Sequence, residues 1–506
     1  VVFSRVFHDE KDSELIILTM DLTVEVSLIS GKTVSLQTHG DESVESLRLR
    51  AQRALGAGKG RLLDSRGSVL DGGAPLKKAR LQEPLTLQVR RVDILGSGSA
   101  FAAILGNGSV VTWGDADFGG DSSGSGVRDE LKNVQQIQAT EDAFAAILGD
   151  GSVVTWGNAD FGGDSSGVRD QLKSVQQIQA TGDAFAAILG DGSVVTWGNA
   201  GYGGDSSGVR DELKNVRQIQ ATYGAFAAIL VDGSVVTWGN ADFGGDSSGV
   251  RDQLKNVQQI QATEYAFAAI LGDGSVVTWG DSRFGGDSSG VRDELKNVQQ
   301  IQATDRAFAA ILEDDSVVTW SDALSGGDSS VVRDQLKSVQ QIHATGYAFA
   351  AILGDGSVVT WGDSGSGGDS SAVRDELKTV QQIQATGDAF AAILVDGSVV
   401  TWGNGGYGGD SSAVRDELKN VQQIQATDAA FAAILEDGSV VTWGDAGAGG
   451  DSSAVQDQLK NVQQIQASRH AFAAILGDGS VVTWDDTGYG GDGSGVRDQL
   501  KNDSSN

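Results

Sequence analysis

The chain has 506 residues, a net charge of −31 and no cysteine. This length exceeds what one compact core normally uses, so several domains or a repeat array are expected. The missing cysteines exclude disulfides, thiolate metal sites and cysteine nucleophiles. The four histidines are scattered singly, so no metal site and no cofactor are predicted. No run of ~20 apolar residues occurs, so no membrane insertion is predicted.

The first ninety residues predict a charged lead-in followed by a small α+β domain. Residues 1–21 form an N-terminal extension that begins at Val1, which leaves an upstream targeting segment open. Apolar residues alternate with polar ones from Leu22 to Leu28, a turn follows, and Val34–Leu36 begins a return strand.

A helix and further strands are predicted to complete this domain. Asp41 is a candidate cap, and the apolar face is expected to use Val44, Leu47, Leu49 and the stretch from Ala51 to Leu55. Leu62-Leu63, Leu70, Leu76 and the segment Leu85–Val89 are predicted to add strands.

This pattern, with Gly31-Lys32-Thr33 and Arg61-Leu62-Leu63, resembles the ubiquitin-like β-grasp over residues 22–91. The resemblance places a protein-binding patch at Ile29 and Leu63, but its third position is the polar Gln88. No Gly-Gly terminus follows Arg91, which excludes a conjugatable modifier and leaves an integral ubiquitin-like domain.

Tryptophan recurs at a fixed spacing through the rest of the chain. The first two are 43 residues apart, and the following eight intervals are 41 residues each. A constant period of this length is typical of a tandem array of one small unit. The tryptophans are Trp113, Trp156, Trp197, Trp238, Trp279, Trp320, Trp361, Trp402, Trp443 and Trp484.

Each unit predicts three short strands. In the third unit, residues 175–181 alternate as a half-buried strand, and Ala184–Leu189 is apolar on both faces and therefore fully buried. An Asp-Gly turn joins it to a strand over residues 193–197. The segment that follows Asp205-Ser206-Ser207 favours one helical turn, with a longer helix as the alternative.

Forty-one residues in three strands bury too little surface alone, so neighbouring sheets are expected to stack, with Phe and Trp of one sheet over the alanines of the next. The motif A-F-A-A-I-L-x-D-G-S-V-V-T-W-G, then G-G and V-x-x-I-x-A, resembles the regulator of chromosome condensation repeat in its short-period form. That resemblance implies a mainly β array of ten three-stranded units over residues 92–502, followed by a tail at 503–506. Ten units fit either a closed propeller or an open spiral.

One rim of the array is the predicted binding site. Strand direction puts the dipeptide between strands one and two on the same rim as the loop after Trp, and the units differ mainly there. Aromatic and charged side chains on such a rim suit protein binding. The candidates are Phe118, Phe161, Tyr202, Tyr223, Phe243, Tyr265, Phe284, Arg306, Tyr347, Tyr407, Arg469, His470 and Tyr489.

No catalytic constellation is evident. The recurrent Gly-Gly-Asp-Ser-Ser lacks the lysine of a phosphate loop and the ligand pattern of a calcium loop, which favours a turn with a capping Asp. Ser, His and Asp do not recur together. The sequence therefore predicts a non-enzymatic interaction scaffold, an adaptor linked to the ubiquitin system.

The alternatives are a guanine-nucleotide exchange factor for a small GTPase, or an architectural subunit. Residues 92–506 carry 23 basic and 56 acidic side chains. The expected partner is therefore a protein, a basic one, and not nucleic acid. A ubiquitin-like domain implies a eukaryotic source and a cytoplasmic or nuclear location.

Overall fold

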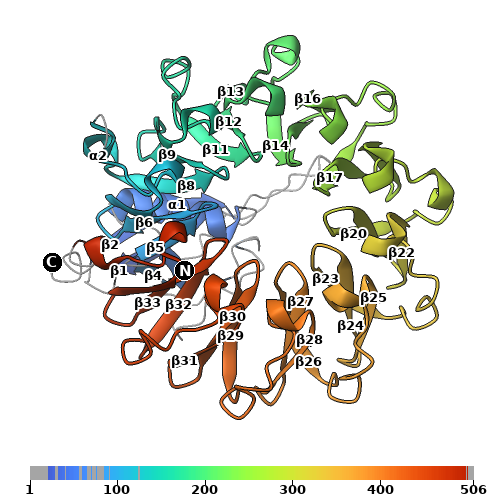
Figure 1. Cartoon of the computed structure of the whole chain (residues 1–506). Coiled ribbons are helices and arrows are strands. Elements are labelled where there is room, and N and C mark those ends of the chain that lie inside the picture. The colour runs from blue at the N-terminus through green and yellow to red at the C-terminus, as the bar shows by residue number, and fades with distance from the viewer. Residues whose placement is uncertain are drawn as a thin grey trace, which may run out of the picture.

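The computed structural model describes residues 21–28, 32–39, 42–55, 60–64, 70, 76, 85–89, 92–123, 126–496 and 499. They form a small N-terminal α+β domain and ten three-stranded sheets that follow one another around a ring (Figure 1). None of the helices in this part of the chain has the length and apolar character to span a bilayer.

The N-terminal domain is one mixed sheet with one helix. Its elements are β1 (Asp21–Leu28), β2 (Thr33–His39), α1 (Val44–Leu55), β3 (Gly60–Leu63) and β4 (Leu85–Val89). The strand order is β2-β1-β4-β3, in which β1 runs parallel to β4 and the other neighbours are antiparallel. The predicted succession of hairpin, helix and two strands is confirmed, whereas its ubiquitin-like character stays a prediction.

Two predictions for this domain are corrected, and two predicted positions lie outside the described residues. Leu49 is 42% exposed and lies off the buried face of α1, because the face repeats at Val44, Leu47, Ala51 and Leu55. Leu70 and Leu76 lie outside the strands, although Leu76 is buried in the core. Ile29 and the predicted cap Asp41 fall outside the described residues, and Leu63 is half-buried at the end of β3.

Each of the ten units contains three antiparallel strands. The first strands, at the inner edge of each sheet in Figure 1, are β5 (Val92–Gly96), β8 (Val134–Ala139), β11 (Val175–Ala180), β14 (Val216–Ala221), β17 (Val257–Ala262), β20 (Val298–Ala303), β23 (Val339–Ala344), β26 (Val380–Ala385), β29 (Val421–Ala426) and β32 (Val462–Ala467). The second strands are β6 (Ala100–Leu105), β9 (Ala143–Leu148), β12 (Ala184–Leu189), β15 (Ala225–Leu230), β18 (Ala266–Leu271), β21 (Ala307–Leu312), β24 (Ala348–Leu353), β27 (Ala389–Leu394), β30 (Ala430–Leu435) and β33 (Ala471–Leu476). The third strands are β7 (Val110–Gly114), β10 (Val153–Gly157), β13 (Val194–Gly198), β16 (Val235–Gly239), β19 (Val276–Gly280), β22 (Val317–Ser321), β25 (Val358–Gly362), β28 (Val399–Gly403), β31 (Val440–Gly444) and β34 (Val481–Asp485).

Short helical turns follow the strands in each unit. The glycine-rich loop after each tryptophan begins with one turn: η1 (Ala116–Phe118), η3 (Ala159–Phe161), η4 (Ala200–Tyr202), η6 (Ala241–Phe243), η7 (Ser282–Phe284), η9 (Ala323–Ser325), η10 (Ser364–Gly368), η11 (Gly405–Tyr407), η12 (Ala446–Ala448) and η13 (Thr487–Tyr489). The later segment holds at most one more turn, as predicted: α2 (Val127–Glu130), η5 (Ser207–Val209), η8 (Ser289–Val291) and η14 (Ser494–Val496).

The core lies between neighbouring sheets. At the junction of the second and third units, Ala143 and Ala145 pack against Phe185 and Trp197. The two rings are parallel-stacked with centroids 5.2 Å apart. The Trp197 Nε1–H donates a hydrogen bond of 3.0 Å to the Gly162 carbonyl of the preceding unit, which satisfies the buried indole. The predicted stacking of aromatic rings over alanines is confirmed.

The tenth unit packs against the first, so the array closes on itself. Ala471 and Ala473 share one core cluster with Phe101 and Trp113. The Trp113 Nε1–H donates a 3.0 Å hydrogen bond to Gly490 across this seam, the same bond that joins units elsewhere. These contacts decide between the two predicted forms in favour of the ring.

Candidate protein-binding rim

The dipeptides between strands one and two share a rim with the loops that follow the tryptophans, as predicted. In the third unit, the Thr181 hydroxyl donates to the Tyr202 carbonyl and accepts from the Ala184 N–H. The Asn199 N–H donates to the Asp183 carbonyl. We call this side of the ring, which carries the ten dipeptides and the helical turns after the tryptophans, the loop rim.

The recurrent Gly-Gly-Asp-Ser-Ser sequence holds this loop in shape. The Ser206 N–H donates to the Thr196 hydroxyl, which donates to the Ser206 hydroxyl. The Asp205 carboxylate accepts from the Ser207 N–H, as a capping Asp does. The motif is therefore part of the scaffold, and its polar groups are engaged within the unit.

A belt of backbone hydrogen bonds joins the first residues of the dipeptides around the centre of the ring. In nine of the ten units, the N–H of this residue donates to the carbonyl of its counterpart in the next unit, over 2.8–3.1 Å. The donor–acceptor pairs are Gly98–Glu141, Glu141–Gly182, Gly182–Tyr223, Tyr223–Glu264, Glu264–Asp305, Asp305–Gly346, Gly346–Gly387, Gly387–Asp428 and Asp428–Arg469.

Within this belt lies the mouth of the central channel. A cavity of about 560 Å³ is lined by the inner ends of six consecutive units, from the eighth across the seam to the third. Its charged side chains are Glu141, Asp428 and Arg469. Five of the six first dipeptide residues around the mouth donate their backbone N–H to the belt, and among the described residues Arg469 at the seam does not, so a ligand there is recognised chiefly through side chains.

The structure brings seven of the predicted residues into one continuous row on the loop rim of the third to seventh units. Neighbouring ring centroids lie 4.8–6.0 Å apart from Tyr202 to Phe284, and Arg306 lies 5.1 Å from the Phe284 ring and 5.5 Å from the Tyr347 ring. We call this the aromatic row: Tyr202, Tyr223, Phe243, Tyr265, Phe284, Arg306 and Tyr347.

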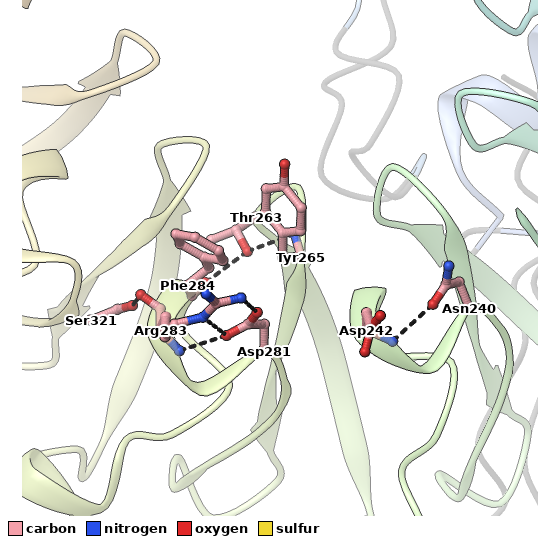
Figure 2. Close-up of polar contacts among 8 residues, drawn as sticks. All are labelled: Asn240, Asp242, Thr263, Tyr265, Asp281, Arg283, Phe284 and Ser321. Carbon is pink, nitrogen blue, oxygen red and sulfur yellow. Dashed lines mark hydrogen bonds and ion pairs between the residues drawn. The ribbon is translucent and has the colours of Figure 1, made fainter.

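Figure 2 shows how the loops hold the middle of this row. The Arg283 side chain donates to both oxygens of Asp281 and lies 5.1 Å from the Phe284 ring. The Ser321 hydroxyl of the next unit donates to the Arg283 carbonyl. Tyr265 stands beside Thr263, which accepts its backbone N–H.

The other predicted residues are not part of the row. Phe118 and Phe161 pack against the core clusters of their own junctions, so they serve largely as covers of the core. His470 and Tyr489 stack on each other, 4.4 Å apart. Tyr407 is 37% exposed and lies apart from the row.

Carboxylates of the dipeptides are the part of the site that the predicted residues left out. Glu141 forms an ion pair with Arg469, 328 residues away and two units distant around the ring. The intervening first unit carries Gly98-Ser99, which has no long side chain to separate them. The sequence shows Arg469, Gly98 and Glu141 at the same position of the tenth, first and second units. It does not show that these units are neighbours, because that requires the ring to close.

Several of these carboxyl groups have raised pKa values. Burial, followed by the charges of Glu141 and Asp183, raises the pKa of Asp142 to about 6. Burial, followed by Glu264, raises the pKa of Asp305 to about 6. Burial, followed by the charges of Glu141 and Asp183, also raises the pKa of Tyr223 to about 12. In the described part of the chain, no group of three or more His, Asp or Glu is arranged to hold a metal ion.

No protein-family model and no curated protein matches this sequence. Among solved structures, Prp20p from Saccharomyces cerevisiae, described with its binding properties to Gsp1p and histones, is 16% identical over 71% of this chain and 83% of that one, with a TM-score of 0.32. Human WBSCR16 is 16% identical over 60% and 86%, with a TM-score of 0.31. The ectodomain of the Arabidopsis thaliana receptor kinase ACR4 is 17% identical over 52% and 92%, with a TM-score of 0.28. At these identities and scores the likenesses do not tell what this chain binds.

Proposed function

We propose that this chain is a non-enzymatic protein-interaction scaffold that presents its loop rim to a partner protein. One observation carries the proposal. The units repeat each other through their strands, while the dipeptides and loop aromatics that differ between units gather on one rim. A surface that combines tyrosine, phenylalanine and arginine has the composition of binding hot spots.

The position of the N-terminal domain supports the choice of rim. A cavity of about 530 Å³ lies between α1, through Arg48 and Leu49, and the Asp-Gly turns at residues 149–151. These turns lie on the rim opposite the dipeptides. Among the described residues the N-terminal domain therefore approaches the turn side, and the loop rim is left for a partner.

The rigidity of the rim also supports binding. The belt of backbone hydrogen bonds and the Thr contacts fix the dipeptides before any ligand arrives, which lowers the entropic cost of association. The excess of acidic residues over the repeats favours a basic partner and disfavours nucleic acid.

The N-terminal domain gives this scaffold its second role in the proposal. Its β2-β1-β4-β3 sheet with one helix agrees with a ubiquitin-like module, which makes the chain an adaptor linked to the ubiquitin system in the cytosol or nucleus. Leu63 is half-buried in this sheet and is the described member of the expected binding patch.

Two variants of the full chain test the proposal. The first replaces Tyr223, Tyr265 and Tyr347 by serine on the loop rim, and the second replaces Val231 and Val395, exposed on the turn rim, by serine. Cross-linking in cell extract followed by mass spectrometry is expected to show partners that the first variant loses and the second retains. Equal loss from both variants, or stimulated nucleotide release from a small GTPase, would replace the proposal.

A further inference from the structure

The row contains one group of three rings that all contact one another. The centroids of Tyr202, Tyr223 and Phe243 are 5.8–6.0 Å apart, and their planes are inclined by 36–82°. The Phe–Trp pairs of the core, by contrast, are inclined by only 15–26°. Inclined, half-buried rings keep part of their faces uncovered, and the face of an aromatic ring attracts cations.

Two glycines make room for this three-ring cluster. A Cβ on Gly182 would lie 2.8 Å from the Tyr223 ring, and one on Gly224 would lie 2.9 Å from the Tyr202 ring and 3.1 Å from the Phe243 ring. The other units carry Asp, Tyr, Ser, Arg, Ala or His at the position of Gly224. The cluster therefore depends on Gly224, since no other unit has glycine at the second position of its dipeptide.

A buried carboxylate without a full set of partners adjoins the cluster. Asp183 is only 7% exposed, and its Oδ1 has no hydrogen-bond partner, while Oδ2 accepts a 3.5 Å contact from Asn199. Its neighbour Gly182 lines the channel mouth beneath the Tyr223 ring. An unsatisfied buried carboxylate oxygen is costly, and a donor that carries positive charge relieves that cost.

The charge around the cluster is negative overall. Burial, followed by the charges of Glu141 and Asp183, raises the pKa of Asp142, which Arg469 opposes, and burial followed by Glu141 raises the pKa of Asp183. Glu141 is already paired with Arg469, and among the described residues neither Asp142 nor Asp183 forms an ion pair with a cationic side chain. A cation from outside is thus attracted both by the ring faces and by these carboxylates.

We propose that the Tyr202–Tyr223–Phe243 cluster and Asp183 bind a lysine or arginine side chain of an extended segment of the partner protein on the loop rim, beside the channel mouth. The inference rests on the proposed function and specifies its partner chemistry. A cation over aromatic rings contributes in proportion to its desolvation. Because the belt occupies the backbone N–H of the first dipeptide residue in nine of the ten units, including Gly182 and Tyr223 beside the cluster, the segment is read through its side chains and not by strand addition.

The test measures binding to the full chain by isothermal titration calorimetry at low salt. The probe is hexalysine acetylated at its N-terminus only, so that its side chains keep their charge, and hexaglutamate is the negative control. Asp183→Asn is expected to weaken hexalysine binding at least tenfold. Asp388→Asn is the matched control, because the substitution removes the same charge at the same position of the dipeptide. Asp388 accepts a hydrogen bond from the Ser366 hydroxyl and does not adjoin the three-ring cluster. Asp388→Asn is expected to change the affinity less than twofold.

The rings are tested separately. Tyr223→Leu and Phe243→Leu are each expected to weaken binding about fivefold, with Tyr407→Leu on the same rim as control, and thermal melting identifies any variant that fails to fold. Equal effects of Asp183→Asn and Asp388→Asn would mean diffuse charge attraction only and overturn the inference, as would the absence of hexalysine binding. If the partners cross-linked through the loop rim persist in Asp183→Asn, the inference fails while the proposed function stands.

Discussion

The residue that follows each tryptophan gives the most direct test of how the units hold together. All ten residues at this position have a positive φ, between 90° and 111°. Eight are glycine, and the exceptions are Ser321 in the sixth unit and Asp485 in the tenth. Side chains other than hydrogen are strained in this conformation. Asp485→Gly is therefore expected to stabilise the protein.

The cause of the strain is visible in the other units. A Cβ on any of the eight glycines would lie 2.6–2.8 Å from the carbonyl oxygen of the second dipeptide residue. In those eight units, the same oxygen accepts a 2.9–3.1 Å hydrogen bond from the residue that follows the glycine. In the described sixth and tenth units, Asp322 and Asp486 do not donate this bond. The extra carbon thus removes a backbone contact as well as straining the chain.

The expected gain follows from these contributions. Relief of the positive φ is worth roughly 1–2 kcal/mol and the restored hydrogen bond about 1 kcal/mol, while the added freedom of glycine in the unfolded chain costs about 0.5–1 kcal/mol. The net gain from Asp485→Gly is about 1–2 kcal/mol.

The stability gained by Asp485→Gly also has a part that depends on pH. Burial, followed by the charges of Asp486 and Asp445, raises the pKa of Asp485 to about 7, and its Oδ2 has no partner. The folded protein binds this proton more tightly than the unfolded chain, so the native protein loses stability as the pH rises from about 4 to about 7. Asp485→Gly abolishes this loss, so its advantage over the native protein widens across that interval.

Ser321→Gly is the control, because Ser321 has the same backbone conformation without a carboxylate. It also loses the hydroxyl bond to Arg283, so its gain is below 1 kcal/mol and independent of pH. Urea midpoints at pH 5 and pH 8, with hydrogen exchange of the β33 and β34 amides, measure both variants. A gain of Asp485→Gly that is the same at the two pH values, or a loss at pH 8, would refute the reasoning.

Three further predictions follow from close contacts and burial. Gly224→Ala is expected to destabilise the protein by about 1–2 kcal/mol in urea because the Cβ overlaps two aromatic rings, whereas Gly208→Ala, which points into open space, has no comparable effect. Asp305→Asn is expected to stabilise the folded protein by about 1 kcal/mol at pH 8 and to have no effect at pH 4. The reason is that burial raises the pKa of Asp305 to about 6, so ionising this carboxyl in the folded state is costly. Equal shifts of the melting temperature at both pH values would contradict this. Gly96→Ala, although it restores the alanine that other units have there, is expected to weaken ring closure by about 1–3 kcal/mol because its Cβ would lie 2.6 Å from the Ala467 carbonyl; an unchanged radius of gyration and urea midpoint would count against it.

The unit itself could be predicted closely from the sequence. Strand two was placed at Ala184–Leu189 because an uninterrupted apolar run must be covered on both faces, and the structure has it there. The alternation after Val175 and the Asp-Gly turn gave the other strands to within a residue. Local patterns suffice here because each unit repeats the same short-range chemistry.

Features that depend on several units could not be predicted in this way. Ring closure depends on the small rotation between neighbouring sheets, which no single unit encodes. The aromatic row and the Glu141–Arg469 pair exist only once that rotation is fixed. Leu49 departs from its prediction for a simpler reason, because it is apolar but its angular position on α1 lies off the face that Leu47 and Ala51 share.

The seam between the tenth and first units ties closure to the candidate site. In the core the seam matches the other junctions, with a Phe101–Trp113 centroid distance of 5.3 Å against 5.1–5.2 Å elsewhere. At the mouth the seam differs in two ways. The strand β5 pairs with β6 without the bulge that interrupts the first strands of the other units. In addition, Gly96 and Gly98 have no Cβ, which leaves room for the backbone carbonyls of Ala467 and Glu141.

This space lets Arg469 reach over the first unit to Glu141. An opened ring would separate the two, leave Glu141 without its ion-pair partner and remove the positive charge that acts on Asp142 and Tyr223, which changes the field at the three-ring cluster. Closure therefore sets the electrostatics of the proposed lysine site. Gly96→Ala should accordingly alter hexalysine affinity although residue 96 lies in a different unit from the rings.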